Sequence, residues 1–398
     1  MSLPDVETAR ATMLAAITPL PGERVPVGEA DGRWLVEPVM ASRDQPPFHA
    51  SAMDGWAVRA ADAIPGARLR IVGESAAGHS PDGAVGPGEA IRIFTGAALP
   101  DGADHVVIQE EAARDGDHVV LGKVAGPAYV RPRGGDFQAG AVLLEAGQRL
   151  NPWRLVLAAA AGGLSVSCGP RPQVAVLANG DELVEPGEAA GPHQIYNSAA
   201  PALAAFARRH AADARTLRPA ADDEAVIRSV VQGEAFDLLV TIGGASVGDH
   251  DRVKPALRSL GADLVVEGVA VRPGKPVWFA ILPDGRPVLG LPGNPASALV
   301  CAELFLAPLL AVMQGGAPEI PMGRALLAEP APANGPRDHY MRAVLASGPD
   351  GALHATPFAN QDSSLVTVMA RSNVLLRRPP GAAASDEGET VEVVGPTL

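Results

Sequence analysis

The chain carries the sequence LLVTIGGASVGDHDRVK at residues 238–254, and this stretch decides how the rest is interpreted. Its apolar run, Leu238–Ile242, is typical of a buried strand and is followed by glycines, two carboxylates and a lysine. Glycines let backbone N–H groups approach an anion, carboxylates hold hard cations, and lysine offers a point charge to phosphate. The stretch therefore predicts a strand with a phosphate and metal site at its carboxyl end.

Strands and helices alternate around this stretch from about residue 171 to 316. The apolar runs are Val174–Ala178, Leu238–Ile242, Val277–Ile281 and Val288–Leu291. The helical stretches are Ala199–Ala212, Asp222–Gln232, Arg252–Leu260 and Ala296–Met313. Continuous apolar strands separated by helices indicate a parallel sheet covered on both faces. Ligands of such sheets bind beyond the carboxyl ends of the strands, so the loops at 179–182, 243–244 and 292–295 should converge on one edge.

Both flanks of this α/β segment are rich in short strands. Gly, Pro and Asp turns separate the runs Leu69–Val72, Ala90–Phe94, His105–Gln109, His118–Leu121 and Ala141–Leu144. After Pro321 the runs are Arg324–Leu327, Tyr340–Ala346, Leu353–Ala355, Asn373–Arg377 and Thr390–Val394, with no long helix. The first 20 residues have helical spacing, and Asn151-Pro152 is typical of the start of a helix that reaches Ala161.

The predicted fold class is therefore α/β plus β, in several domains. We expect a helix and a linking or dimerisation subdomain at 1–45 and 141–170, and a β-rich domain at 46–140. We expect a central α/β domain at 171–318 and a C-terminal β-barrel-like domain at 319–398.

Composition excludes several classes of protein. The chain has 398 residues, 47% of them apolar, and a formal charge of −13, which argues against a general nucleic-acid or acidic-membrane binder. Cys168 and Cys301 are far apart in apolar surroundings, so neither a disulfide framework nor a cysteine metal site is supported. No uninterrupted apolar run reaches membrane-spanning length and no signal-peptide pattern begins the chain, so we expect a cytoplasmic protein.

Lysine is rare in the chain. Only Lys123, Lys254 and Lys275 are present, and two of the three lie in or near glycine-rich segments. A composition biased toward arginine would produce such a pattern by chance about as readily as a functional site would.

Six motifs in fixed order span most of the chain. They are residues 47–57 (PFHASAMDGWA), 92–97 (RIFTGA), 180–183 (GDEL), 241–254, 272–276 (RPGKP) and 291–297 (LPGNPAS). Together they resemble the molybdopterin molybdenumtransferases, that is, the MoeA-type proteins and the related gephyrin E domain. No single short motif carries this assignment, but six in matching order are far more specific.

The resemblance implies an elongated homodimer of four-domain subunits whose third domain binds an adenylylated pterin. The implied reaction takes molybdopterin-adenylate and molybdate, cleaves the phosphoanhydride with the divalent metal Mg²⁺, and releases AMP with the molybdenum cofactor. A molybdopterin adenylyltransferase is an implied partner that would supply the substrate.

The resemblance also implies roles for particular residues. The acidic cleft residues are Asp54, Asp136, Glu182 and Asp251, of which Asp54, Glu182 and Asp251 are the candidate metal ligands. Lys254, Arg272 and Lys275 would offset the charge of phosphate and molybdate. The implied oxyanion pocket consists of Lys275, Ser297, Arg342 and Ser363. The remaining implied substrate-binding residues are Thr95, Gly243, Gly244, Ser246, Pro292, Gly293 and Asn294.

Each assignment has a structural alternative. Gly243-Gly244 alone is more often a tight turn than a phosphate site, and Asp251 could cap the helix that follows it. Asp54 precedes a glycine, which alone is a hairpin signal, and Glu182 could be a solvated loop acid. The histidines lack ligand spacing, so none is assigned to a metal.

Several positions depart from the family pattern. Residues His49, Ala50, Trp56, Ala199 and Arg272 differ from the residues usual there, with smaller departures at Asn179 and Ala245. These departures permit a weakened or non-catalytic scaffold paralogue, although no peptide groove is marked in the sequence.

Two enzyme alternatives also stay open at this stage. A related pterin adenylyltransferase would match only residues 171–316, and the long β-rich flanks disfavour it. A dehydrogenase is disfavoured further, because no Gly-x-Gly-x-x-Gly follows the first strand of the core. Sequence does not distinguish molybdate from tungstate as the co-substrate.

Overall fold

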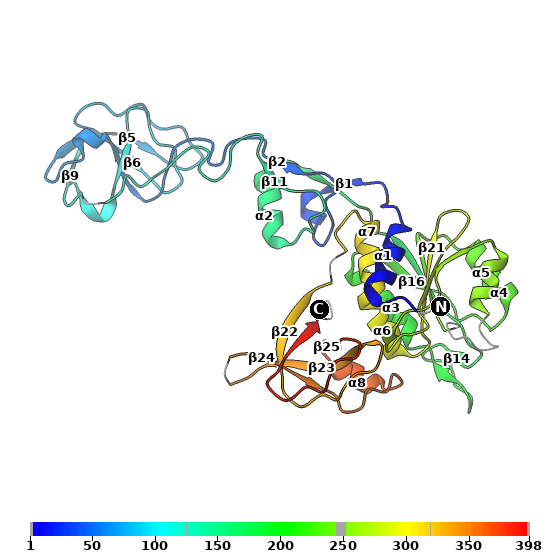
Figure 1. Ribbon diagram of the computed structural model, residues 1–398. Helices are drawn as coiled ribbons and strands as arrows, with labels where there is room; N and C mark the ends of the chain where they lie inside the picture. The colour runs from blue at the N-terminus through cyan, green and yellow to red at the C-terminus, as the bar shows by residue number, and fades with distance from the viewer. Residues whose placement is uncertain (1–2, 125, 244–251, 319, 350, 396–398) are drawn as a thin grey trace.

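The chain folds into an elongated molecule in which a small β unit stands apart from a larger body (Figure 1). The computed structural model describes residues 3–124, 126–243, 252–318, 320–349 and 351–395. Three units follow one another from the free-standing end: a distal β unit, a linking unit, and a body made of an α/β sheet and a C-terminal barrel.

The distal unit is built on a six-stranded sheet, here called the distal sheet. Its strand order is β7-β4-β6-β5-β9-β8. The bounds are β4 (Gly55–Val58), β5 (Arg68–Ser75), β6 (Glu89–Ile93), β7 (His105–Ile108), β8 (Ala112–Asp115) and β9 (His118–Leu121). The pair β3 (Ala50–Ser51) and β10 (Val130–Arg131) lies beside it, with short 3₁₀ turns η2 (Ala60–Asp62) and η3 (Gln109–Glu111). The strands expected from sequence in this segment are confirmed, although their ends differ by a few residues.

The linking unit joins segments from before and after the distal unit. Strand β1 (Glu23–Pro26) pairs with β12 (Ser165–Cys168), and β2 (Val39–Met40) pairs with β11 (Val142–Leu144). The unit also holds the turn η1 (Val27–Glu29) and the helix α2 (Pro152–Ala160). Asn151 caps α2, since its side chain accepts the backbone N–H of Arg154 at 2.9 Å. Val25, Leu35, Leu150 and Val166 share one buried cluster, so the two segments form a common core.

The body contains a mixed sheet of order β16-β13-β17-β21-β20-β18. The bounds are β13 (Gln173–Ala178), β16 (Asp213–Thr216), β17 (Leu238–Ile242), β18 (Asp263–Val266), β20 (Trp278–Ile281) and β21 (Pro287–Leu291). The first four strands in the sheet order are parallel, while β20 and β18 are antiparallel to their neighbours. Strand β20 reverses because only five residues join it to β21, too few for a parallel crossover.

Helices cover both faces of this sheet (Figure 1). One face buries apolar side chains against α1 (Val6–Ala15), α3 (Ala199–Arg209) and the long helix that begins at Pro295, and the other against α4 (Glu224–Gly233) and α5 (Val253–Ser259). The continuous apolar character of β13 and β17 follows from this double coverage. A small arm of β14 (Leu183–Val184) and β15 (Ile195–Tyr196) extends from the sheet.

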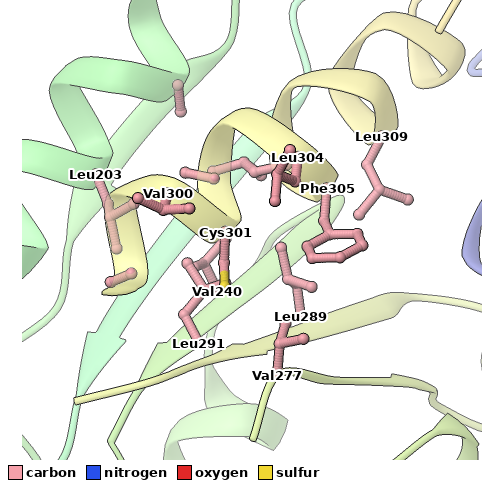
Figure 2. Close-up of a cluster of buried hydrophobic side chains, with 14 of the residues drawn as sticks. Leu203, Val240, Val277, Leu289, Leu291, Val300, Cys301, Leu304, Phe305 and Leu309 are labelled. Carbon is pink, nitrogen blue, oxygen red and sulfur yellow. The ribbon is translucent and has the colours of Figure 1, made fainter. Parts of the chain in front are cut away.

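The long helix passes through the centre of the body. It runs as α6 (Pro295–Cys301), a π-helical turn η4 (Ala302–Leu306) and α7 (Ala307–Met313). Figure 2 shows its apolar side chains, including those of Val300 and Phe305, packed toward the sheet strands. Its 19 residues are long and apolar enough to span a membrane, but the apolar window is 78% buried within the protein. This helix is therefore part of the buried core of the body. Cys301 within it is a buried free thiol, as is Cys168.

The C-terminal unit is a β-barrel. Strands follow the order β19-β23-β24-β22-β26-β25, and β25 pairs back onto β23 to close it. The bounds are β19 (Val271–Arg272), β22 (Met322–Leu327), β23 (Asp338–Ser347), β24 (Leu353–Pro357), β25 (Val374–Arg378) and β26 (Thr390–Val394), with the short helix α8 (Val366–Arg371). Strand β19 comes from the α/β segment, so the barrel and the mixed sheet share a boundary.

Candidate functional site

Three loops meet at the carboxyl edge of the mixed sheet. Strands β13, β17 and β21 are parallel neighbours, with Ala178 opposite Ile242 and Ile242 opposite Leu291. The loops after these strands line a cavity of about 750 Å³, a volume within the ordinary range of ligand pockets. A ligand in this cavity would contact loops that are far apart in the sequence.

Glycine is required at the floor of the cavity. Gly243 has a φ of 91°, and a Cβ there would lie 2.7 Å from the carbonyl oxygen of Asn179. Asn179 is 5% exposed, and its Nδ2 donates to Oδ1 of Asp222 over 3.1 Å. No side chain fits between the two loops, so backbone groups lie at the surface of the cavity there.

Cations and hydroxyls occupy another wall. Arg272, Lys275 and Arg337 line it, together with Ser297 in the first turn of α6. The turn that presents Lys275 needs Gly274, whose φ is 121° and whose Cβ would lie 2.3 Å from the Sγ of Cys301. This wall can bind an anion through charge and through hydroxyl donors.

The C-terminal barrel completes the cavity with residues 361–363. Nδ2 of Asn294 donates to Oγ of Ser363 over 2.8 Å, which joins the loop after β21 to the barrel. The backbone N–H and the hydroxyl of Ser364 lower the pKa of Asp362, so this carboxylate is ionised at neutral pH. The cavity therefore lies at the junction of two units.

Arg342 lies behind this wall and is fully buried. Its backbone N–H and Nε both donate to Oε1 of Gln361, at 2.9 and 3.1 Å, and Gln361 lines the cavity. Among the residues that the structure describes, neither Nη1 nor Nη2 of Arg342 has a hydrogen-bond partner. Burial lowers the pKa of the guanidinium, which nevertheless remains a cation. Arg342, which was expected in the oxyanion pocket, therefore does not line the cavity but places a positive charge behind its wall.

Nine of the residues assigned from the family resemblance line the cavity. They are Glu182, Gly243, Arg272, Lys275, Pro292, Gly293, Asn294, Ser297 and Ser363. Lys254 is mostly buried in the first turn of α5 and is not among the lining residues. Gly244, Ser246 and Asp251 lie outside the described residues.

Three assigned residues lie away from the cavity within one chain. Asp54 and Thr95 belong to the distal unit, at the opposite end of the molecule (Figure 1). Oδ1 of Asp54 accepts the backbone N–H of Thr95 at 2.7 Å and its hydroxyl at 2.8 Å. These bonds lower the pKa of Asp54, and the charge of Arg92 adds to the effect. Asp136 is exposed in a turn where the distal unit meets the linking unit, and its N–H donates to the carbonyl oxygen of Gln45.

Sequence reasoning missed several lining residues. Asn179 lies in the loop at 179–182 that was expected at this edge, but no role was assigned to it. Asn197 and Ser198 precede α3, while Arg337 and Gln361 come from the barrel segment. No local pattern identifies the last two, because only the packing of the barrel brings them to the sheet edge.

The carboxylates of the cavity suit a magnesium ion that is held mainly by substrate phosphates and water. In the described ranges no group of three or more His, Cys, Asp or Glu side chains could hold a metal by itself. Of the residues that the structure describes, Glu182 and Asp362 are the carboxylates that line the cavity. Because Mg²⁺ is commonly bound by one or two carboxylates plus phosphate oxygens and water, these residues fit that ion in the presence of a phosphorylated substrate.

Comparison with protein families covers nearly the whole chain. Residues 4–162 match the MoeA N-terminal region (domain I and II), and residues 175–312 match a probable molybdopterin binding domain. Residues 324–395 match the MoeA C-terminal region (domain IV).

Individual relatives agree with these matches. The molybdopterin molybdenumtransferase of a Nostoc species is 37% identical over 74% of this chain and 70% of its own length. That of Bacillus subtilis is 32% identical over 91% of this chain and 87% of its own length. A crystal structure of a molybdopterin biosynthesis MoeA protein from Pyrococcus horikoshii is 30% identical, covers 100% of both chains and has a TM-score of 0.82. The chain therefore belongs to the MoeA family, the molybdopterin molybdenumtransferases of molybdenum cofactor biosynthesis.

Proposed function

We propose that the cavity at the carboxyl ends of β13, β17 and β21 is where molybdopterin-adenylate and molybdate react, with release of AMP. The observation that carries this proposal is the convergence of Arg272, Lys275, Ser297 and Ser363 from two units on one cavity of about 750 Å³. Both reactants are anions, so cations and hydroxyl donors are needed to bring them together.

The molybdate oxyanion occupies the wall formed by Lys275, Ser297 and Ser363. Lysine and hydroxyl donors suit a tetrahedral dianion, and the buried charge of Arg342 adds to the positive potential behind this wall. Arg272 offsets phosphate charge with a planar fork of donors, which differs from the lysine usual at this position.

The adenylylated pterin lies along the glycine loops. Gly243 and the turn at 292–294 offer backbone groups to phosphate without obstruction by side chains. Glu182 would hold a magnesium ion together with the substrate phosphates, and that ion would neutralise the pyrophosphate and polarise its phosphorus. Asp251 and Lys254 remain proposed contributors from the segment that follows Gly243.

Asp54 and Thr95 can act at this cavity only from a second copy of the chain. Within one chain they lie at the far end of an elongated molecule (Figure 1). A homodimer would let the distal unit of one copy reach the cavity of the other. An apolar surface supports dimer formation, because Trp153 and Val156 on α2 are 88% and 72% exposed and Leu164 is 94% exposed.

The setting of the reaction follows from the substrates. A molybdopterin adenylyltransferase would supply the adenylate, in the cytoplasm. Nucleic acid is not a proposed partner, since the chain carries a net charge of −13.

The test is release of AMP by the purified protein. Molybdopterin-adenylate and Mg²⁺ are supplied with molybdate, with tungstate, or with neither, and AMP is quantified with time. We expect release that depends on the oxyanion, accompanied by activation of an apo-molybdoenzyme. Absence of AMP release with both oxyanions would reject the proposed reaction.

A further inference from the structure

Arg92 bonds to the residue that follows Asp54 and to a residue that contacts the backbone of Asp54. Its Nη1 donates to the carbonyl oxygen of Gly55 over 3.0 Å, and its Nη2 donates to Oε1 of Gln109 over 2.9 Å. The backbone N–H of Gln109 in turn donates to the carbonyl oxygen of Asp54 over 3.0 Å. The guanidinium of Arg92 therefore connects Gly55, which follows Asp54, to Gln109, which hydrogen-bonds to the carbonyl oxygen of Asp54.

Two aromatic rings hold this guanidinium in place. Its central carbon lies 5.3 Å from the ring centroid of Trp56 and 4.9 Å from that of Phe94. Such cation–π contacts leave the in-plane N–H groups of arginine available for hydrogen bonds. A lysine ammonium is not planar and cannot stack on both rings while donating along the same two directions.

The loop that carries Asp54 is also seated tightly on its neighbouring strand. A Cβ on Gly55 would lie 2.1 Å from the carbonyl oxygen of Val107 in β7. Backbone contact this close leaves little room for the loop to shift toward β7. The bond from Arg92 to the carbonyl oxygen of Gly55 adds a side-chain contact to this close backbone packing.

The two carboxylate oxygens of Asp54 differ, because Oδ1 accepts hydrogen bonds and Oδ2 is available to a ligand. Oδ1 of Asp54 accepts both the N–H and the hydroxyl of Thr95, three residues beyond Arg92. Within the part of the chain that the structure describes, no donor bonds Oδ2 of Asp54. The direction of Oδ2 is therefore set by the backbone of Asp54 and by its pair with Thr95.

We propose that Arg92 is a positioning residue for Asp54: it fixes the backbone from which the carboxylate is presented and does not itself touch substrate. This inference rests on the proposed function, in which Asp54 acts at the cavity of a second copy. Removing the guanidinium leaves the Gly55 carbonyl and the Gln109 amide without their donor. The Asp54 carboxylate then samples several directions, while the oxyanion wall is unchanged.

The experiment compares Arg92→Ala, Arg92→Lys and Arg70→Ala in the full chain. Arg70 lies on β5 of the same sheet, where it pairs with Glu89 and its side chain is 60% exposed, so it is a matched control for loss of a surface cation. Amide hydrogen exchange at Thr95 is followed by NMR, and molybdate-dependent AMP release gives kcat and KM.

We expect Arg92→Ala to exchange the Thr95 amide at least tenfold faster and to lose at least tenfold in kcat, with the KM for molybdate within twofold of wild type. Millimolar guanidinium should restore both exchange protection and kcat, an effect that a general loss of stability would not produce. Arg92→Lys should have lower exchange protection at Thr95 and a lower kcat than wild type, and Arg70→Ala should match wild type in both.

Unchanged Thr95 exchange in Arg92→Ala would overturn the proposal, as would wild-type kcat in Arg92→Lys. If Arg92→Ala does not fold, the same exchange measurement is made on Arg92→Lys and Gln109→Ala. Gln109→Ala removes the bond to Nη2 of Arg92, and unchanged Thr95 exchange in both variants would overturn the proposal. If the wild-type chain releases no AMP, the proposed function fails separately, and Thr95 exchange still decides whether Arg92 positions the loop.

Discussion

The side-chain amide of Asn294 donates a hydrogen bond to the hydroxyl oxygen of Ser363, with 2.8 Å between Nδ2 and Oγ. Asn294 precedes the long central helix and Ser363 precedes α8 of the barrel, yet both line one cavity. This bond joins the α/β sheet to the barrel at the wall proposed to hold the oxyanion. The position of the Ser363 hydroxyl therefore depends on a residue of the other unit.

Loss of this bond should weaken oxyanion binding. A hydrogen bond of this kind contributes about 1 kcal/mol, so Asn294→Ala should raise the KM for molybdate roughly fivefold. Ser363→Ala should have a larger effect because it also removes a ligand donor. In a double-mutant cycle the two changes should be less than additive. Strict additivity in the measured KM values would show that the bond does not position Ser363.

Gly274→Ala should damage the same wall by a different route. The substitution places a Cβ 2.3 Å from the Sγ of Cys301 at a φ of 121°. Such strain and overpacking cost about 1–3 kcal/mol in the free energy of unfolding, and Lys275, the next residue, should be displaced. Cys301→Ala in the same chain should recover part of the loss in urea denaturation, since it removes the clash but not the backbone strain. If Cys301→Ala does not raise the free energy of unfolding of Gly274→Ala, the whole loss comes from backbone strain at residue 274.

The fold follows from sequence wherever pattern and packing agree. Leu238–Ile242 is a strand with the predicted bounds, and Asn151 caps the helix that begins at Pro152, because both patterns are local. The edge strands Asp213–Thr216 and Asp263–Val266 were not predicted. The first has no apolar run at all, so only pairing with β13 makes it a strand.

The site was predictable only in part, for a physical reason. Gly243 and Asn294 lie in turns directly after parallel strands, and the geometry of a parallel sheet brings those turns together. Lys275 was assigned from the family resemblance, and its turn lies between β19 of the barrel and the antiparallel strand β20. Gln361 and Arg337 reach the cavity from the barrel, and no periodicity encodes how the barrel packs. The domain boundaries and the roles of the individual site residues stay predictions.

Stability should fall as the pH is lowered from 7 to 5. Burial, reinforced by Arg272, Arg342, Arg337 and Arg378, lowers the pKa of His339 to about 4, below its usual 6.5. The unfolded chain then binds a proton that the folded chain does not, so stability is present above pH 6.5 and is lost as the pH falls toward 4. For this group the loss between pH 7 and 5 is about 2 kcal/mol.

Urea denaturation of the wild type and of His339→Gln at both pH values measures this contribution. The variant should lose about 2 kcal/mol less than the wild type over the interval. It should keep a pH dependence from His210, whose pKa burial also lowers to about 4. Equal pH dependence in the two proteins would mean that His339 is protonated in the folded chain.

A mixture of two inactive variants should regain activity if Asp54 acts on the cavity of a second copy. Asp54→Ala and Lys275→Ala are each expected to be inactive. In a mixed dimer, one cavity has the lysine of its own chain and the aspartate of the partner. Random exchange of equal amounts makes half of the dimers mixed, each with one intact site, so about a quarter of wild-type AMP release should return. Recovery that stays at zero after subunit exchange, verified by native mass spectrometry, would place both groups in one chain, and an active Asp54→Ala would remove Asp54 from the reaction.

The central claim is that the cations and hydroxyls of the cavity bind the oxyanion, and Lys275 tests it most directly. The chain offers its own control, since Lys123 is an exposed lysine of the distal unit that does not line the cavity. Molybdate-dependent AMP release is measured for Lys275→Ala, Lys123→Ala and wild type over a range of molybdate concentrations. Loss of a charge-assisted contact worth about 3 kcal/mol should lower kcat/KM for molybdate roughly a hundredfold in Lys275→Ala and leave Lys123→Ala unchanged. Wild-type kcat/KM in Lys275→Ala would contradict the account.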